Sequence, residues 1–293
     1  MNGAARHPLR CAGRGLWLAG AFLAAGLGWC WARARGPLSA RTRAVWLRRH
    51  SQRVLRILRV RLRADGPLPV PGFLVANHLG YLDILVLAAM TPCVFVAKRE
   101  VRHWPLLGWF ARMAGTVFVD RERRADTGRA VAAMKALAAE GVTVVLFPEG
   151  TSSDGRVVLP FKSALLEPLT GQPACTVAHL HYALADGDPA DEVCYWRDMT
   201  LLPHLLNLLT KQAVAAEVYS RRIPTRGYDR KLLAQVLHRA VTELAWRKAQ
   251  VAATPAGAAA TRALETGLIR QETLTWAGGG IAAGRCSSPN QAS

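Results

Sequence analysis

Two residues five positions apart, His78 and Asp83, are the best candidates for acid–base chemistry in this chain. They follow a short apolar run, and five residues of ideal helix would turn through about 500°, which points the two side chains in quite different directions. Gly80 between them permits a turn, so we expect a strand, a turn and then a helix near Asp83. A carboxylate that holds one imidazole nitrogen leaves the other free to take a proton from a hydroxyl. The stretch therefore predicts a general base with its orienting carboxylate.

Three further polar residues, Lys98, Arg121 and Glu149, each follow an apolar run typical of a strand, as His78 does. Strands that alternate with helices predict a largely parallel sheet, and ligands bind beyond the carboxyl ends of such strands. One edge of the sheet could therefore collect all four side chains. We predict an α/β fold with a mixed, largely parallel sheet flanked by helices.

The elements that must position these residues follow from the apolar pattern. A domain over residues 57–250 is expected to contain all of these elements. Pro105 is expected in the first turn of the helix at 104–114. Strands are predicted at 57–62, 73–76, 93–97, 116–119, 142–147, 176–180 and 213–219. Helices are predicted at 82–90, 104–114, 126–139, 201–210 and 228–248.

The positive charge of the chain is concentrated near its start. The formal net charge is +18, and the first 63 residues contain 14 arginines and no acidic residue. The remainder is therefore close to neutral. Such a basic segment predicts an anionic partner, which is either a membrane surface or nucleic acid.

An uncharged stretch at residues 15–32 lies inside this basic segment. As a helix of 1.5 Å rise per residue it would be about 27 Å long, enough to cross a bilayer or dip deeply into it. Arginines flank it, and Trp17, Trp29 and Trp31 suit the membrane interface. A signal peptide is the alternative, but the arginines directly after the apolar run oppose export. We predict a hydrophobic membrane-anchoring helix.

Residues 41–56 interleave apolar side chains with six arginines. The pattern predicts a basic amphipathic helix on anionic headgroups, with a solvated charged face or a nucleic-acid-binding arm as alternatives. Because the neighbouring apolar stretch already requires lipid, we assign residues 1–56 to a membrane anchor and expect no nucleic acid partner. Residues 251–293 are rich in small residues and are expected to form a disordered, low-complexity tail.

The motifs resemble those of a known family. Asn77-His78 with Asp83 resembles the NHxxxxD signature of the glycerolipid (lysophosphatidate-type) acyltransferases, and residues 147–151 look like their FPEGT signature. Residues 115–121 are similar to the family's intervening block, which ends in a substrate-binding arginine. The resemblance covers about residues 60 to 220, and two signatures in the right order make it specific.

The resemblance implies transfer of an acyl chain from a thioester of coenzyme A or acyl carrier protein to a lipid hydroxyl. His78 would be the general base and Asp83 its orienting partner. Neither a metal nor a bound cofactor is implied. The substrate-binding candidates are Asn77, Lys98, Arg121, Glu149, Gly150 and Thr151. The enzyme would act at a membrane, on the cytoplasmic face of the inner membrane.

One departure from the family leaves the acceptor open. Many phosphatidate-forming members follow FPEGT with arginine, whereas this chain continues with Ser152, Ser153 and Asp154. We expect 1-acyl-sn-glycerol-3-phosphate as the acceptor, giving phosphatidic acid, with lyso-ornithine lipid or another lysophospholipid as the alternative. An inactive, membrane-tethered lipid-binding module is the alternative of another class.

Overall fold

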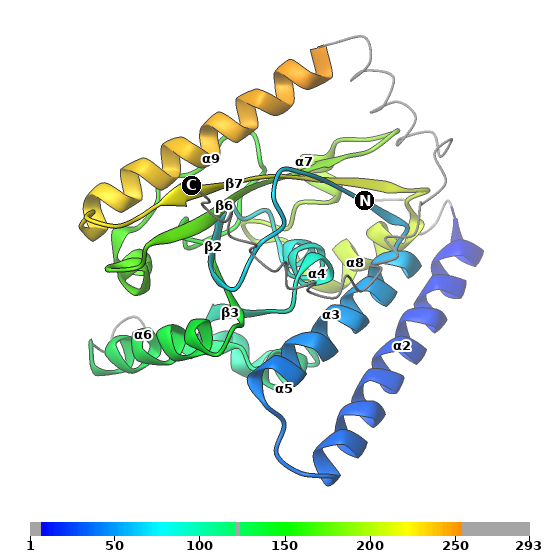
Figure 1. Cartoon of the computed structure of the whole chain (residues 1–293). Coiled ribbons are helices and arrows are strands. Elements are labelled where there is room, and N and C mark those ends of the chain that lie inside the picture. The colour runs from blue at the N-terminus through cyan, green and yellow to red at the C-terminus, as the bar shows by residue number, and fades with distance from the viewer. Residues whose placement is uncertain (1–6, 121–123, 254–293) are drawn as a thin grey trace, which may run out of the picture.

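The computed structural model describes residues 7–120 and 124–253. A mixed, mostly parallel sheet of seven strands forms its centre, in the order β1-β7-β6-β2-β5-β3-β4 (Figure 1). This confirms the predicted α/β class. The strands are β1 (Val60–Asp65), β2 (Gly72–Ala76), β3 (Cys93–Lys98), β4 (Val117–Val119), β5 (Thr143–Leu146), β6 (Ala174–Ala183) and β7 (Val214–Pro224).

The strand directions decide which chain segments meet at one edge of the sheet. β2 is parallel to β5 and β6, and β3 is parallel to β5 and β4. β7 is antiparallel to β6 and parallel to β1. The start of β1 therefore lies at the same edge as the carboxyl ends of β2, β5 and β3.

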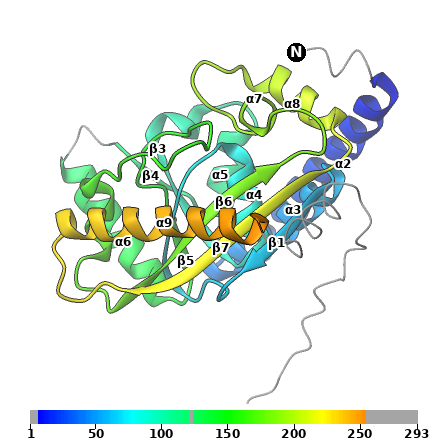
Figure 2. The same cartoon turned by 90° about the horizontal axis from the view of Figure 1, so that it is seen from above.

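Helices cover both faces of the sheet. They are α2 (Pro8–Ala34), α3 (Ala40–Ile57), α4 (Tyr81–Met90), α5 (Leu107–Ala114), α6 (Arg124–Ala139), α7 (Pro189–Glu192), α8 (Leu201–Thr210) and α9 (Arg230–Ala253), with short 3₁₀ helices η1 (Arg99–His103) and η2 (Ser163–Leu169). Figure 2 shows α9 lying across the sheet.

β2 is buried on both sides, because its alternate residues enter different cores. Leu74 and Ala76 belong to the core that includes residues of α3 and α4. Phe73 and Val75 belong to the second core, which includes residues of α6 and α9. Burial on both faces explains why this strand is a continuous apolar run in the sequence.

The predicted N-terminal apolar helix is α2, which is long and apolar enough to cross a membrane. It packs on the rest of the protein: Trp46 of α3 donates to the carbonyl of Ala25 at 3.3 Å, and Arg10 donates to the carbonyl of Thr210 in α8 at 3.0 Å. Its other side is exposed and apolar. The exposed residues there are Leu9, Leu16, Leu23, Leu27 and Trp31.

Several predicted boundaries were wrong, the clearest at Pro105. The helix expected from Trp104 begins only at Leu107. A residue before proline is driven out of the α region, and Trp104 is extended, with φ −64° and ψ 133°. The first strand begins at Val60 rather than Ile57, because α3 continues through Ile57.

At the other end, α9 continues through residues 251–253, which were assigned to the tail. The rest of that tail, residues 254–293, lies outside the described residues.

Candidate active site

The turn between β2 and α4 depends on Gly80. Its φ of 149° lies in a region that side chains disfavour, and a Cβ added there would lie 2.8 Å from the Cβ and backbone nitrogen of Tyr195. Glycine is therefore needed both for the backbone conformation and for the close approach of Tyr195. The turn brings Asp83, in the first turn of α4, back toward His78 at the end of β2.

Asp83 is fully buried, and both of its carboxylate oxygens are hydrogen-bonded. Oδ2 lies 2.8 Å from Nδ1 of His78 and accepts the backbone N–H groups of Leu79 at 2.6 Å and Gly80 at 3.0 Å. Oδ1 accepts the hydroxyl of Tyr182 at 2.6 Å. A buried carboxylate is stable only with such a complete set of donors, and this set also fixes its position.

His78 is held both by its ring and by its backbone. Its ring stacks on Phe147, with centroids 4.2 Å apart and planes 16° from parallel. The backbone N–H of His78 donates to Oε1 of Glu149 at 3.1 Å, and its carbonyl accepts the N–H of Ser153 at 2.9 Å. The side chain remains 23% exposed. No residue in the described part of the chain hydrogen-bonds to Nε2, so this nitrogen is available to a substrate.

Glu149 is a second buried carboxyl beside the histidine, and only 2% of it is exposed. One oxygen accepts the His78 amide, while Oε2 has no partner among the described residues. Burial raises the pKa of Glu149 to about 8, although the nearby backbone N–H groups of His78 and Leu159 act in the opposite direction. The carboxyl is therefore largely neutral near pH 7.

The remaining predicted site residues have different surroundings. The Asn77 side chain accepts the N–H of Leu180 at 2.7 Å and donates to its carbonyl at 3.1 Å, so its amide joins β2 to β6. Gly150 has a backbone φ of 74°. The side chains of Thr151 and Lys98 are exposed to solvent. Lys98 ends β3, the strand beside β5, and no described contact joins it to His78. Arg121 lies outside the described residues.

Sequence analysis missed Tyr182, which holds the second oxygen of Asp83. β6 extends to Ala183, beyond the predicted end of this strand. The signal was the period of two in a strand, because Ala178, Leu180 and Tyr182 share one face and one core. The stacking of Phe147 on His78 was also missed, although Phe147 begins the second signature.

The site offers base chemistry supplied by side chains. Among the residues that the structure describes, no group of three or more His, Cys, Asp or Glu side chains is arranged to hold a metal ion. The reactive arrangement is an imidazole with one nitrogen fixed by a carboxylate and the other unoccupied. Such a pair can accept a proton from a hydroxyl placed against Nε2.

Comparison with known proteins gives consistent matches. A family model described as acyltransferase matches residues 58–180. A lyso-ornithine lipid O-acyltransferase of Rhizobium meliloti is 38% identical over 189 residues, which is 59% of this chain and 65% of the relative. One of Brucella abortus is 36% identical over 65% of this chain and 78% of the relative. A 1-acyl-sn-glycerol-3-phosphate acyltransferase of Neisseria meningitidis is 40% identical, over 39% of this chain and 46% of the relative.

The fold also matches a solved structure. The crystal structure of the 1-acyl-sn-glycerophosphate acyltransferase PlsC from Thermotoga maritima aligns with a TM-score of 0.59 and 21% sequence identity. The alignment covers 83% of this chain and 97% of that chain. At this identity the match supports the fold, including the arrangement of helices around the sheet.

Proposed function

Because the chain belongs to the acyltransferase family, we propose that it transfers a fatty acyl chain from a thioester to the free hydroxyl of a lysolipid. One observation carries this proposal. His78 Nδ1 lies 2.8 Å from the buried Asp83 carboxylate, while Nε2 of the partly exposed ring has no described partner. This is the geometry that a general base requires.

In the proposed reaction, Nδ1–H of His78 donates to Asp83, so Nε2 is the basic nitrogen. Nε2 takes the proton of the lysolipid hydroxyl as its oxygen attacks the thioester carbonyl carbon. The C–O bond forms, the C–S bond breaks, and the imidazolium returns its proton to the departing thiolate. Asp83 keeps the ring oriented and stabilises the transient positive charge.

We propose lyso-ornithine lipid as the acceptor, in place of the lysophosphatidate that the sequence analysis put first. Support comes from the Rhizobium and Brucella relatives, whose matches extend over more of this chain than the match to the Neisseria relative. 1-Acyl-sn-glycerol-3-phosphate remains the second candidate, because that shorter match has the higher identity.

The loop after the second signature favours the same acceptor. Ser152 stands where an arginine would offer a bidentate phosphate contact, and the backbone N–H of Ser153 holds the His78 carbonyl. Asp154 follows, with its side chain 20% exposed and its Oδ2 3.7 Å from Nε of Arg156. An acidic residue suits the ammonium group of an ornithine headgroup better than it suits a phosphate.

Glu149 is proposed to contact the acceptor through its unpartnered Oε2, with Gly150 and Thr151 beside it. A neutral carboxyl can donate a hydrogen bond as well as accept one, so it does not repel an anionic group. Lys98 and Arg121 are proposed to supply positive charge to the headgroup or to the donor. The donor is an acyl thioester of coenzyme A or acyl carrier protein and is a co-substrate.

We propose that α2 holds the enzyme in one leaflet, on the cytoplasmic face of the membrane. Contacts of α2 with α3 and α8 bind one side of the helix to the protein. α3 carries arginines along its length and therefore belongs at the headgroups rather than in hydrocarbon. The opposite, exposed side of α2 is the apolar surface left for lipid.

The experiment is an acyl-transfer assay with purified protein in detergent. Acyl-CoA and acyl carrier protein donors are each tested with lyso-ornithine lipid and with 1-acyl-sn-glycerol-3-phosphate, and His78→Ala is the control. We expect transfer to lyso-ornithine lipid that His78→Ala abolishes. Transfer only to the glycerol phosphate would replace the acceptor, while activity in His78→Ala equal to the parent would refute the base assignment.

A matched variant tests the acceptor assignment. Ser152→Arg restores the arginine that follows the signature in many phosphatidate-forming relatives. We expect kcat/KM for 1-acyl-sn-glycerol-3-phosphate to rise relative to lyso-ornithine lipid, with Ser152→Gln as the uncharged control. An unchanged ratio in both variants would show that this loop does not select the headgroup.

A further inference from the structure

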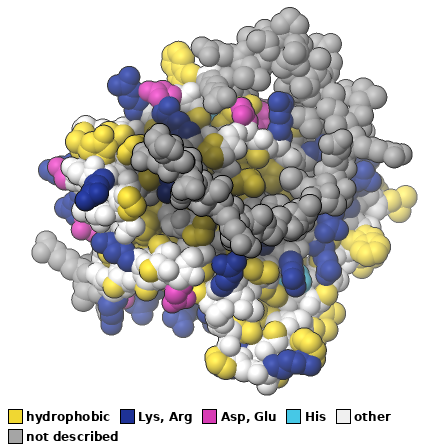
Figure 3. Space-filling view, viewed as in Figure 1, with side chains coloured by type: hydrophobic (Ala, Val, Ile, Leu, Met, Phe, Trp, Pro, Cys, Tyr) yellow, Lys and Arg dark blue, Asp and Glu magenta, His cyan; other side chains and the backbone are white. Residues whose placement is uncertain are grey.

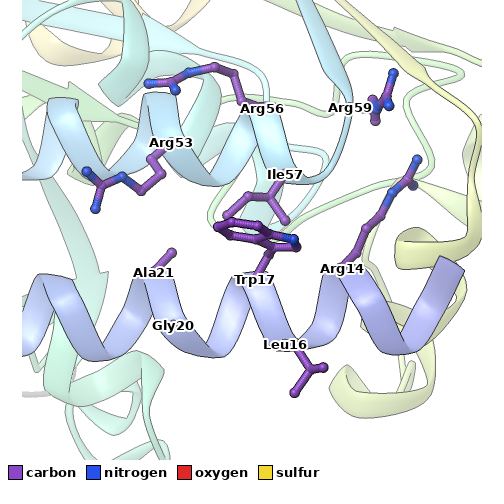
Figure 4. Close-up of a pocket in the computed structure, with 9 residues that line it drawn as sticks. All are labelled: Arg14, Leu16, Trp17, Gly20, Ala21, Arg53, Arg56, Ile57 and Arg59. Carbon is purple, nitrogen blue, oxygen red and sulfur yellow. The ribbon is translucent and has the colours of Figure 1, made fainter. Parts of the chain in front are cut away.

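A cavity of about 970 Å³ lies between α2 and α3, away from the turn that carries His78 (Figure 4). It is lined by apolar groups in the middle, chiefly Trp17 of α2 and Ile57 of α3. The cavity takes no part in the proposed acyl transfer. Its basic lining residues are Arg14, Arg53, Arg56 and Arg59.

The side chains of the cavity come from both helices and from Arg59, which directly precedes β1. In Figure 4 Arg14 extends from α2 toward Arg59, and Trp17 lies against Ile57 across the gap. Arg53 points from α3 toward α2 on the other side of Trp17, while Arg56 points away from α2. An anion in the cavity would therefore meet guanidinium groups on both sides of an indole ring.

These positive charges are not neutralised within the described part of the chain. Arg53, Arg56 and Arg59 are exposed, and none of them forms an ion pair with a described acidic residue. Arg14 donates to the carbonyls of Leu209 and Lys211, which are neutral groups. Because the first 63 residues contain no Asp or Glu, the segment itself supplies no counter-charge.

The mouth of the cavity opens onto apolar surface. Leu16 and Trp17, which line it, are 76% and 75% exposed on α2. In Figure 3 yellow hydrophobic and dark blue basic side chains lie side by side at the lower right, where α2 and α3 lie. A ligand with a charged head and an apolar body could use both surfaces at once, with its body along α2.

We propose that this cavity binds the phosphate of an anionic bilayer phospholipid, at a site separate from the acceptor site at His78. One guanidinium group can bind two phosphate oxygens through two parallel N–H···O hydrogen bonds. Tryptophan favours the headgroup region of a bilayer. The apolar mouth selects a lipid over a soluble phosphate. Arg59 directly precedes β1. The start of β1 lies at the same edge of the sheet as the carboxyl end of β2, which His78 follows. Bound lipid would hold that edge toward the membrane.

The test compares two double variants of the full-length protein that lose equal charge. Arg53→Gln with Arg59→Gln removes two cavity arginines, whereas Arg41→Gln with Arg49→Gln removes two exposed arginines of α3 that do not line it. Binding is measured by co-flotation with phosphatidylcholine vesicles containing phosphatidylglycerol. We expect the cavity variant to bind about 10-fold more weakly than the control, because a diffuse surface charge would weaken both alike. Equal losses would overturn the proposal.

A second measurement locates the lipid at Trp17. Phosphatidylglycerol with brominated acyl chains should quench tryptophan fluorescence less in Trp17→Phe than in the parent protein. Millimolar inorganic phosphate should not reverse this quenching, since the bound species is a lipid. Identical quenching in both proteins, or its reversal by phosphate, would refute the site. Neither measurement uses acyl transfer, so either can fail while the proposed function stands.

Discussion

The turn that carries His78 and Asp83 contains a buried, paired charge, whereas the region of α2 and α3 contains exposed charges with no described acidic partner. At the turn, the Asp83 carboxylate is fully buried, and His78, Tyr182 and two backbone N–H groups bind its oxygens. Arg53 on α3 and Arg59 just after it are exposed and have no acidic partner in the described part of the chain. The turn holds one carboxylate in a fixed position, while the helical region contains several guanidinium groups that no described acidic side chain holds in place.

The difference shows what each region can do. A buried, fully hydrogen-bonded carboxylate acts over one or two bond lengths and orients a base, and removing one partner leaves a costly unsatisfied group. Exposed arginines act over about a Debye length and attract any anionic surface, so their effect weakens with salt. Catalysis should therefore depend on single atoms, and membrane binding on summed charge and the cavity.

The largest expected effect is that of His78→Ala on kcat, which should leave membrane binding unchanged. His78→Ala removes the base, and we expect kcat to fall by about 10²- to 10⁴-fold. Vesicle binding should remain at the parent level, because the residue lies outside α2 and α3. Acyl-transfer assays and vesicle co-flotation on the same preparation measure both quantities. A parallel loss of membrane binding would break the proposed separation.

The next effect comes from Tyr182→Phe, which leaves Oδ1 of Asp83 without its donor. An unsatisfied buried acceptor costs about 1–3 kcal/mol, so we expect lower thermal stability and a kcat about 10-fold lower, because Asp83 is freer to turn. Tyr219→Phe is the control: it removes a hydroxyl that donates to Glu217 at 3.3 Å in β7. Tyr219→Phe should affect stability alone. Equal kcat for both variants would show that Tyr182 does not position the base.

Local patterns predicted the contact between His78 and Asp83 because the two residues are close in the sequence. Five residues, one glycine and a preceding strand were enough to infer that His78 and Asp83 meet. The strand-by-strand alternation also predicted the sheet, because strands buried on both faces are continuous apolar runs.

Longer-range features could not be predicted in the same way. Tyr182 lies 99 residues from Asp83 and meets it only because β6 extends alongside β2. The cavity arginines were seen as one basic stretch, since nothing local shows that Arg14 of α2 approaches Arg59. The helix expected from Trp104 begins only at Leu107, because Pro105 drives the residue before it out of the α region.

Salt should sharpen the comparison with a smaller effect. Raising ionic strength from about 0.1 M to about 1 M shortens the Debye length from about 10 Å to about 3 Å. We expect vesicle binding to weaken several-fold, while kcat in detergent changes little because the His78–Asp83 contact is short and partly buried. Titrations at matched pH measure both. A kcat that falls as steeply as vesicle binding would contradict this contrast.

The smallest expected effect concerns Oε2 of Glu149, a buried oxygen with no hydrogen-bond partner among the described residues. Burial raises the pKa of this carboxyl from 4.5 to about 8. The folded state therefore holds the proton more tightly than the unfolded state, so this group stabilises the fold below pH 4.5 and loses that contribution as pH rises through about 8. Glu149→Gln should flatten the fall in Tm between about pH 5 and pH 8.5 by a few degrees, whereas Glu140→Gln, which removes an exposed carboxylate, should leave it unchanged. If the Tm of Glu149→Gln falls with pH as steeply as that of the parent, Glu149 is ionised in the folded protein. Oε2 must then accept hydrogen bonds, and the Glu149 carboxylate would be as fully paired as that of Asp83.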